Sequence, residues 1–174
     1  QGAHREVAGI RLAAAGRAEA GLVPIDEEFR QVRELLVRAA ARDPLEDALP
    51  GEPPFTCFQR RHLELQRQMD QMAGALRERA RGLLGRASVR LRQLAELDAA
   101  MEQLLAPRQQ GLAGGALRAL ERQFKKQRTE AEPGWEGRFT AHWREAVHAE
   151  MDLRLSPAAG LVAALRNERN TNLS

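Results

Sequence analysis

The chain has 174 residues with 27 Lys and Arg against 24 Asp and Glu, a formal net charge of +3, no Tyr and only 4% aromatic residues, so strands lack their usual β-branched and aromatic material. Its one cysteine, Cys57, excludes an intrachain disulfide and a cysteine-based zinc site, and it suits a reducing compartment. No apolar run approaches the roughly 20 residues that a membrane span needs, so the composition indicates an all-α, cytoplasmic protein.

The N-terminal part is predicted to hold a weak helix followed by a strong one. Residues 1–24 form a marginal helical arm or linker, because Gly9 and Gly16 interrupt it and few large apolar groups anchor it. The stretch GLVPID is a turn in which Asp26 is a good N-cap for a helix to about residue 42. The acidic, proline-rich stretch 43–54 then forms a connector.

A long helix is predicted from Phe55, because apolar residues recur at steps of four and three, the pattern of a heptad seam. Gly82 and Gly85 loosen its end, and Ser88 can cap the next helix, which runs to about Gln109. Two heptad helices separated by a short break predict an antiparallel helical hairpin. The first seam comprises Phe58, His62, Leu65, Met69, Met72, Leu76 and Leu83, and the second comprises Leu91, Leu94, Asp98, Met101 and Leu105.

Three more helical segments complete the predicted fold. One covers residues 112–128 after a flexible turn, and one covers 136–155 with apolar residues spaced by four. Pro157 then starts a short third helix, since proline suits a first helical turn, and residues 169–174 form a frayed polar tail. We therefore predict an all-α fold, in which residues 25–168 form an elongated helical bundle built on the long antiparallel helical hairpin.

Asp98 occupies a seam position where leucine is expected. An unpaired buried charge is strongly unfavourable, so the carboxylate needs a cation. If the hairpin turns near Gly85, Asp98 faces roughly residues 72–77, and Arg77 is the natural partner because a guanidinium binds a carboxylate through two hydrogen bonds. We expect this pair to fix the register of the hairpin, as polar seam residues do in coiled coils.

No strong catalytic motif is present, and no cofactor or metal is expected. The stretch GLAGG at 111–115 lacks the Lys-Ser/Thr of a phosphate loop, and Cys57 with His62 lacks an orienting partner for nucleophilic catalysis. A weaker alternative is a metal-dependent hydrolase or nuclease, because carboxylates and histidines spaced by four on two facing helices can hold a divalent ion. The residues of this alternative are Asp98, Glu102, His148 and Asp152.

Two arginine-rich stretches, 77–92 and 118–128, favour another alternative, a DNA-binding subunit without sequence preference. On one side of the bundle their side chains would bind phosphates in a strongly salt-dependent way. The competing interpretation is a solvated helix face with ion pairs four residues apart, such as Glu121 with Lys125. The candidate contacts are Arg77, Arg79, Arg81, Arg86, Arg90, Arg92, Arg118, Arg122, Lys125, Lys126 and Arg128.

Three stretches stand out together: FQRRHLELQRQMDQMAGALRERARGLL, VRLRQLAELDAAMEQLLAPRQQGLAGGALRALERQF and HWREAVHAEMDLRLSPAAGLVAALR. They resemble a proteobacterial family known as domain of unknown function 3348. The resemblance covers about residues 27–166, with Met151 and Ser156 where the family pattern has Leu and Gln. Because the chain starts at Gln1 rather than Met, and the family's usual N-terminal segment is not visible, we expect it to be part of a longer protein.

The resemblance implies a cytoplasmic accessory component of type III Zorya antiphage defence, encoded beside a membrane motor and stator pair similar to the flagellar MotA and MotB proteins. It transfers no catalytic residues. With long amphipathic helices and no strong chemistry, the chain is predicted to bind a protein from the same operon, or else a second copy of itself, through its seams. The resemblance also marks polar positions that form either one buried ionic layer or a site: Arg60, Arg61, Asp98, Glu102, Glu150, Asp152 and Arg154.

Overall fold

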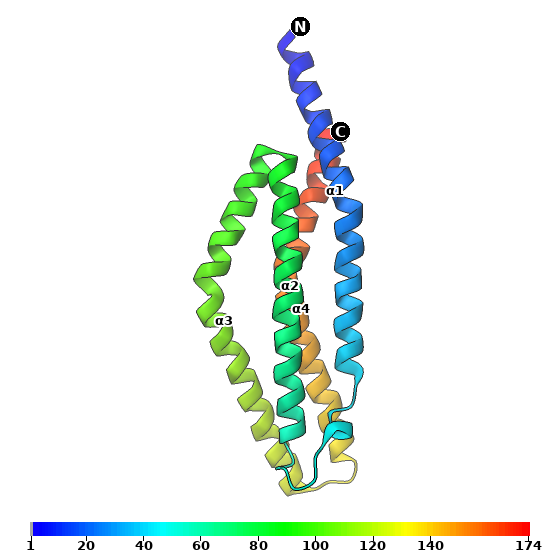
Figure 1. The fold of residues 1–174 in the computed structure, drawn as a ribbon, viewed down its shortest axis with the longest axis vertical. Coiled ribbons are helices and arrows are strands. Elements are labelled where there is room, and N and C mark those ends of the chain that lie inside the picture. The colour runs from blue at the N-terminus through cyan, green and yellow to red at the C-terminus, as the bar shows by residue number, and fades with distance from the viewer. Residues whose placement is uncertain (1) are drawn as a thin grey trace. The chain divides into compact units, whose positions relative to one another are not determined.

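The computed structural model describes residues 2–174, with side-chain burial from residue 4 onward, and confirms the all-α prediction. A short 3-10 helix, η1 (Pro44–Asp47), lies in the predicted connector, where the Asp43 carboxylate accepts a hydrogen bond from the backbone N–H of Leu45. No helix formed by these residues is both long enough and apolar enough to cross a membrane. The four α-helices of this part of the chain are α1 (Gly2–Ala41), α2 (Thr56–Ala87), α3 (Val89–Glu130) and α4 (Trp135–Leu173) (Figure 1).

The chain divides into two compact units, and each contains a part of every α-helix. Unit 1 comprises the residues up to 33 together with 72–104 and 155–174, and unit 2 comprises 34–71 and 105–154. α1 and α4 run without a break through residues 24 and 168, where the boundaries of the arm and of the tail are expected.

Unit 1 contains the turn of the predicted hairpin. Ser88 alone separates α2 from α3, whose adjoining parts run antiparallel (green in Figure 1). Its side-chain oxygen accepts a hydrogen bond from the backbone N–H of Leu91 at 3.3 Å, which confirms the predicted cap. At the other helix end, Arg17 donates from Nε (3.2 Å) and Nη2 (3.0 Å) to the carbonyl of Ala87, one of the C-terminal carbonyls that α2 itself leaves unpaired.

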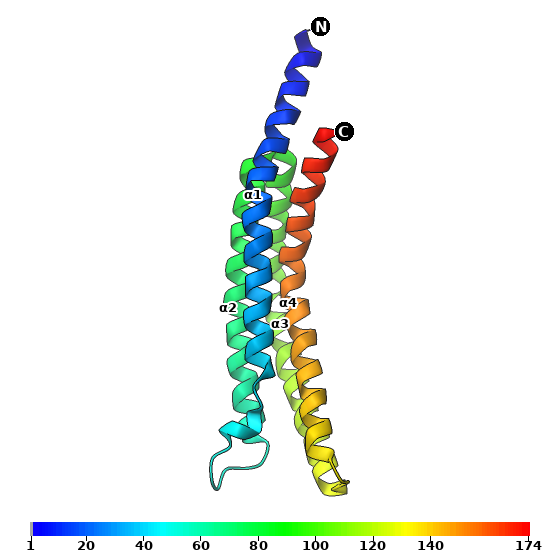
Figure 2. The same cartoon turned by 90° about the vertical axis from the view of Figure 1, so that its right-hand side faces the viewer.

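The parts of α1 and α4 in unit 1 lie side by side (blue and red in Figure 2). Arg166 binds both carboxylate oxygens of Asp26 at 3.0 Å, and Arg169 binds Glu19 at 3.1 Å. Asp26 is therefore an ion-pair partner in the middle of α1, and its prediction as an N-cap is wrong. The predicted frayed tail is also wrong, because α4 remains helical to Leu173.

Small side chains dominate the core of unit 1 and allow the helices to approach closely. A Cβ atom on Gly21 would lie 3.1 Å from Cδ2 of Leu83, which is tighter than ordinary van der Waals contact. Residues 14–22 contribute to this core, whereas residues 4–13 are exposed. The buried residues of α1 in this part are Ala14, Ala15, Ala18 and Leu22.

Two helix breaks predicted at prolines are absent, because Pro24 lies inside α1 and Pro157 lies inside α4. The reason is burial on both sides of each proline. Leu22 and Ile25 are each 2% exposed, and so is Leu155. Burial of such side chains stabilises by about 1.5–3 kcal/mol each, which is comparable with the roughly 3 kcal/mol that an internal proline costs a helix.

The predicted turn at 111–115 is likewise wrong, because α3 continues through these residues to Glu130. Helical glycine costs only about 1 kcal/mol relative to alanine. Residues 113–117 are half-buried in unit 2, and this packing keeps the segment helical.

The core of unit 2 is aromatic. Phe58 stacks or packs edge-on against four other rings, with centroid distances of 5.0 Å to Phe139, 5.7 Å to Phe124 and 5.8 Å to Trp143. The four-residue spacing predicted along α4 is confirmed, since each of its members is at most 2% exposed. These members are Phe139, Trp143, Val147, Met151 and Leu155.

Candidate functional site

In unit 1, α3 turns a different face to its neighbours from the one predicted. The predicted seam residue Leu91 is buried at 3% exposure and Ala95 beside the seam at 7%, whereas the predicted seam residues Leu94 and Met101 are 37% and 47% exposed. Asp98 keeps its predicted inward position, with a side chain only 14% exposed. The inward face therefore includes Asp98 beside Leu91 and Ala95, whereas Leu94 and Met101 lie toward solvent.

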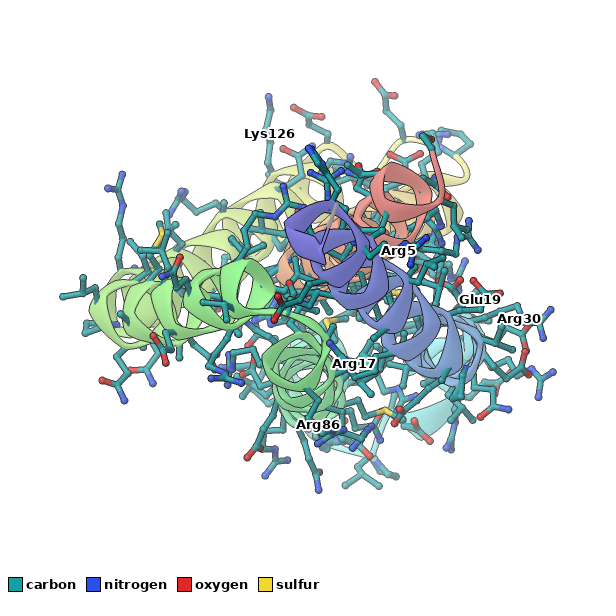
Figure 3. The ribbon with its side chains drawn as sticks, turned by 90° about the horizontal axis from the view of Figure 1, so that it is seen from above. Arg5, Arg17, Glu19, Arg30, Arg86 and Lys126 are labelled. Carbon is teal, nitrogen blue, oxygen red and sulfur yellow. The ribbon has the colours of Figure 1, made fainter. Side chains whose placement is uncertain are left out.

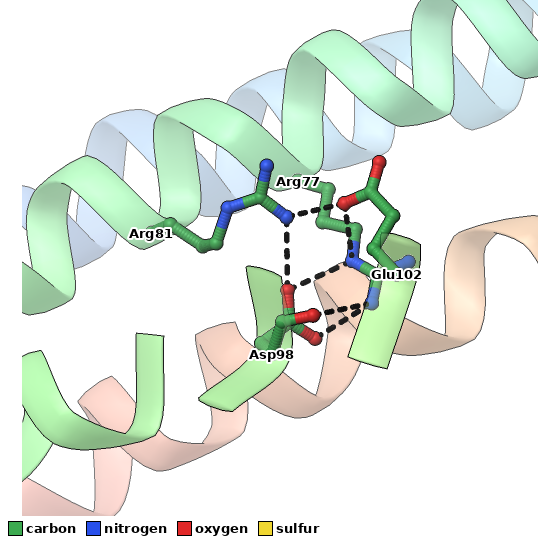
Figure 4. Close-up of polar contacts among 4 residues, drawn as sticks. All are labelled: Arg77, Arg81, Asp98 and Glu102. Atoms are coloured by element: carbon green, nitrogen blue, oxygen red, sulfur yellow. Dashed lines mark hydrogen bonds and ion pairs between the residues drawn. The ribbon is translucent and has the colours of Figure 1, made fainter. Parts of the chain in front are cut away.

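The inward carboxylate of Asp98 binds the predicted arginine. Arg77 on α2 donates from Nε to Oδ2 at 2.8 Å and from Nη2 to Oδ1 at 2.9 Å (Figure 4). This two-bond fork is the strongest geometry available to an arginine and a carboxylate. The predicted Arg77–Asp98 pair is confirmed.

Two further residues complete the cluster, which we call the arginine–carboxylate network: Arg77, Arg81, Asp98 and Glu102 (Figure 4). Arg81 Nη1 lies 3.0 Å from Asp98 Oδ2 and 2.5 Å from Glu102 Oε2. The sequence analysis missed Arg81 as a partner, although both helices carry their charged residues four apart, the spacing that places side chains on one face.

The network is electrically balanced, with two positive and two negative groups. Burial by itself raises the pKa of Asp98, but the hydrogen bonds and charges of Arg77 and Arg81 outweigh it and hold that pKa below its usual value. Burial lowers the pKa of Arg81, and the two carboxylates reverse that effect. Asp98 therefore stays ionised at neutral pH. Its ion pairs hold α3 against α2 in one orientation about the helix axis, which we call the setting of α3.

This setting leaves an apolar row on the outside of α3, which we call the outer row: Leu94, Leu97, Met101 and Leu104. Leu97 is 57% exposed and Leu104 is 78% exposed. The steps along the row are three, four and three, so its members share one face at the spacing of a coiled-coil seam. All four residues belong to unit 1.

Unit 2 holds a second buried polar cluster, centred on His62, which is 1% exposed. Trp143 donates its indole N–H to Nδ1 of His62 at 3.0 Å, and Nε2 of His62 lies 2.6 Å from Glu150. Because tryptophan can only donate, Nδ1 carries no proton, and the neutral ring turns its Nε2–H toward the carboxylate. Gln66 also donates to Glu150, at 2.9 Å.

The Glu150 carboxylate is ionised in this setting. Burial raises its pKa, but the hydrogen bonds from His62 and Gln66 and the charge of Arg154 outweigh that effect, so the pKa lies below its usual value. Every member of the cluster is engaged with another and shielded from solvent, so the arrangement is suited to hold helices together rather than to bind a substrate.

The remaining family-pattern residues also lie in unit 2, each with its own contacts. Arg60 binds Glu52, Arg61 donates to the carbonyl of Ala39, and Arg154 binds Asp70. Asp152 also has an interaction partner. Asp98 and Glu102 belong to unit 1, so the polar positions marked by the resemblance are divided between the two units.

The residues of the hydrolase or nuclease alternative are likewise divided between the two units. Asp98 and Glu102 bind arginines in unit 1, whereas His148 and Asp152 belong to unit 2. Across residues 2–174 no group of three or more His, Cys, Asp or Glu side chains is arranged to hold a metal ion. Burial raises the pKa of the Cys57 thiol, which disfavours a nucleophilic thiolate.

Ion pairs engage most of the arginines in the first basic stretch. Besides the two in the network, Arg79 binds Glu28 and Arg90 binds Glu168. Arg92 donates to the carbonyl of Gly85, and Arg86 is exposed on the outer side of α2 (Figure 3). The charge of this stretch that remains for phosphate binding is therefore smaller than its sequence suggests.

The second basic stretch lies in unit 2, so the structure does not establish a stripe shared with the first. The predicted pair between Glu121 and Lys125 is confirmed, with a distance of 3.3 Å. The other candidate contacts of this stretch are exposed on α3: Arg118, Arg122, Lys126 and Arg128.

A cavity of about 330 Å³ lies in unit 2 beside the connector. Phe58, Phe124 and Phe139 line it, with Arg128 and Glu136 among its other lining residues. The three phenyl rings are at most 5% exposed because they pack on one another. Little of their surface is left for a ligand, so the outer row is the stronger candidate site.

Comparison with known proteins yields one match. The model of the family described as "Protein of unknown function (DUF3348)" matches residues 5–167. No curated protein and no solved structure shows significant similarity to the chain.

Proposed function

The chain belongs to the DUF3348 family, and we propose that it is a non-catalytic component of a protein assembly, binding a partner protein through α3. The observation that carries the proposal is the outer row. Large apolar side chains gathered on one exposed face mark interaction sites in soluble proteins. A helix that docks on such a face contacts it through apolar side chains spaced by three and four residues, which is also the spacing of the outer row.

The setting of α3 strengthens this interpretation. Burying a leucine or methionine side chain stabilises a fold by about 1.5–3 kcal/mol, and the four side chains of the outer row remain 37–78% exposed in the isolated chain. The inward face of the same helix instead holds Asp98 and Glu102, each bound by arginine. A partner that covers the outer row would bury this exposed apolar surface and so stabilise the complex.

We further propose that the assembly acts in antiphage defence. The support is the resemblance of the three quoted stretches to accessory components of type III Zorya systems. On this proposal the partner is encoded in the same operon and is linked to the MotA- and MotB-like membrane motor. The polar clusters of both units bind their own members, which supports a binding component rather than an enzyme.

Co-expression with the products of the adjacent genes tests the proposal. We expect the tagged chain to co-elute with one of them in size-exclusion chromatography, in a fixed ratio that survives dilution. Loss of phage protection on deletion of the gene would accompany that result. A chain that elutes free of every neighbouring product would contradict partner binding, and protection unchanged by the deletion would contradict the role in defence.

A further inference from the structure

We propose that the outer row is the docking face for an amphipathic helix of the partner, whose apolar seam is bordered by acidic residues. The inference rests on the proposed function and specifies the chemistry of its partner. The shape of the seam follows from the row itself. Leu94, Leu97, Met101 and Leu104 occupy alternating three- and four-residue steps, so they receive side chains of a second helix at the same spacing.

The acidic border follows from the charges beside the row. Arg90 precedes Leu94 by four residues, which places it on the same helix face, and its side chain remains 68% exposed although it binds Glu168. Arg86 and Arg92 are also exposed near the α2–α3 turn. This basic end of unit 1 favours carboxylates on a docked helix, because opposite charges at the rim of an interface steer the partner and fix its register.

A second copy of the chain fits the same face poorly. In a parallel pairing of the outer row with itself, Arg90 faces the same residue of the other copy. In an antiparallel pairing with Leu97 opposite Met101, the heptad register sets position 90 opposite position 108, which is also arginine. Like charges at facing positions are unfavourable, and both self-pairings place arginine against arginine, whereas an acidic helix brings carboxylates to the same positions.

A pair of synthetic peptides provides the direct probe. Each is a 21-residue helix with leucine at every seam position, one with glutamates at both ends and the other with lysines at the same positions. Binding to the intact chain is measured by fluorescence anisotropy at low and high salt. We expect the glutamate peptide to bind at least about tenfold more tightly than the lysine peptide at low salt, and the difference to shrink at high salt.

Matched variants locate the contact. Leu97→Glu and Met101→Glu place a negative charge in the row, and Gln103→Glu makes the same change on the exposed opposite side of α3. We expect each of the first two to weaken binding of the glutamate peptide by at least about tenfold, and the third to change it by less than about twofold. Circular dichroism verifies that all three variants remain helical.

The outcomes separate this inference from the proposed function. Failure of both peptides to bind, a preference for the lysine peptide, or equal effects of Met101→Glu and Gln103→Glu would overturn the inference. If the wild-type chain captures a neighbouring gene product and Leu97→Glu captures it equally well, the outer row is not the docking face but partner binding stands. If the wild-type chain captures no neighbour, the proposed function itself falls.

Discussion

Replacing Asp98 by leucine is expected to lower the free energy of unfolding by about 2–3 kcal/mol, because Arg77 and Arg81 then face each other with one carboxylate instead of two. The value lies below the usual range for a fully buried pair, since the side chains of the network keep 12–36% of their surface exposed. Urea unfolding followed by circular dichroism measures the change. The matched control is Glu96→Ala on the exposed side of the same helix, expected to change stability by less than about 0.5 kcal/mol.

The double variant Arg77→Leu/Asp98→Leu removes both partners of the ion pair, so it separates the cost of an unpaired charge from the cost of altered packing. It leaves Arg81 and Glu102 as a balanced pair, so we expect stability within about 1 kcal/mol of the wild type, although each single change is costly. Such non-additivity is the signature of two residues that interact directly. Single variants whose effects simply add would show that Arg77 and Asp98 do not stabilise the fold through their direct interaction.

Replacing Trp143 by alanine is expected to destabilise the chain by about 3–5 kcal/mol, because it removes a fully buried indole from the aromatic core of unit 2. The change also leaves Nδ1 of His62 without its donor. Trp143→Phe keeps most of the ring volume and removes the N–H, so it isolates the cost of the unpaired nitrogen, about 1–3 kcal/mol.

The matched control for Trp143 is Trp135, the other tryptophan, which is half-buried at the start of α4. Trp135→Ala is expected to cost clearly less than Trp143→Ala, because less of its surface is buried. Thermal unfolding of the three variants gives the order. A loss at position 135 as large as that at position 143 would contradict the core assigned to unit 2.

The sequence predicted the residues of the Asp98 pair but not the rotation of α3. Two rows on this helix share Leu91 and Asp98: the predicted seam also includes Leu94 and Met101, whereas the buried row also includes Ala95. Hydrophobic spacing favours the row with larger side chains. Arg81, one turn after Arg77, selects the other row because it binds Glu102, and such a choice depends on distances that the sequence pattern does not contain.

The predicted helix breaks at Pro24 and Pro157 were wrong for a related reason. Pro24 and Pro157 are local signals of a break, whereas the burial that keeps α1 and α4 continuous comes from residues distant in the chain. The sequence pattern predicted the burial of His62 and of Trp143 in unit 2, but not the contact between them. His62 stood in a heptad seam and Trp143 in a row spaced by four, yet nothing in either pattern joins the two side chains.

α2 shows the limit of the heptad pattern itself. Its predicted seam is buried from Phe58 to Met69 and at Leu76, but Met72 is half-buried beside the buried Ala73. After Leu76 the buried residues are Ala80 and Leu84 rather than Leu83. A straight helix has 3.6 residues per turn, so a strict seven-residue repeat drifts around it. The drift moves Arg77 and Arg81 to the side where they meet Asp98.

Oxidation of the methionines by dilute hydrogen peroxide, read by mass spectrometry on the folded chain, measures the setting of α3 most directly. Met101 is 47% exposed, whereas Met69 and Met151 are each 1% exposed, so we expect Met101 to oxidise at least about tenfold faster than either. In the Arg77→Leu/Asp98→Leu variant, α3 is free to turn its larger apolar residues inward, and Met101 should become slower. A wild-type Met101 as protected as Met69 would contradict the outward apolar row and, with it, the proposed docking face.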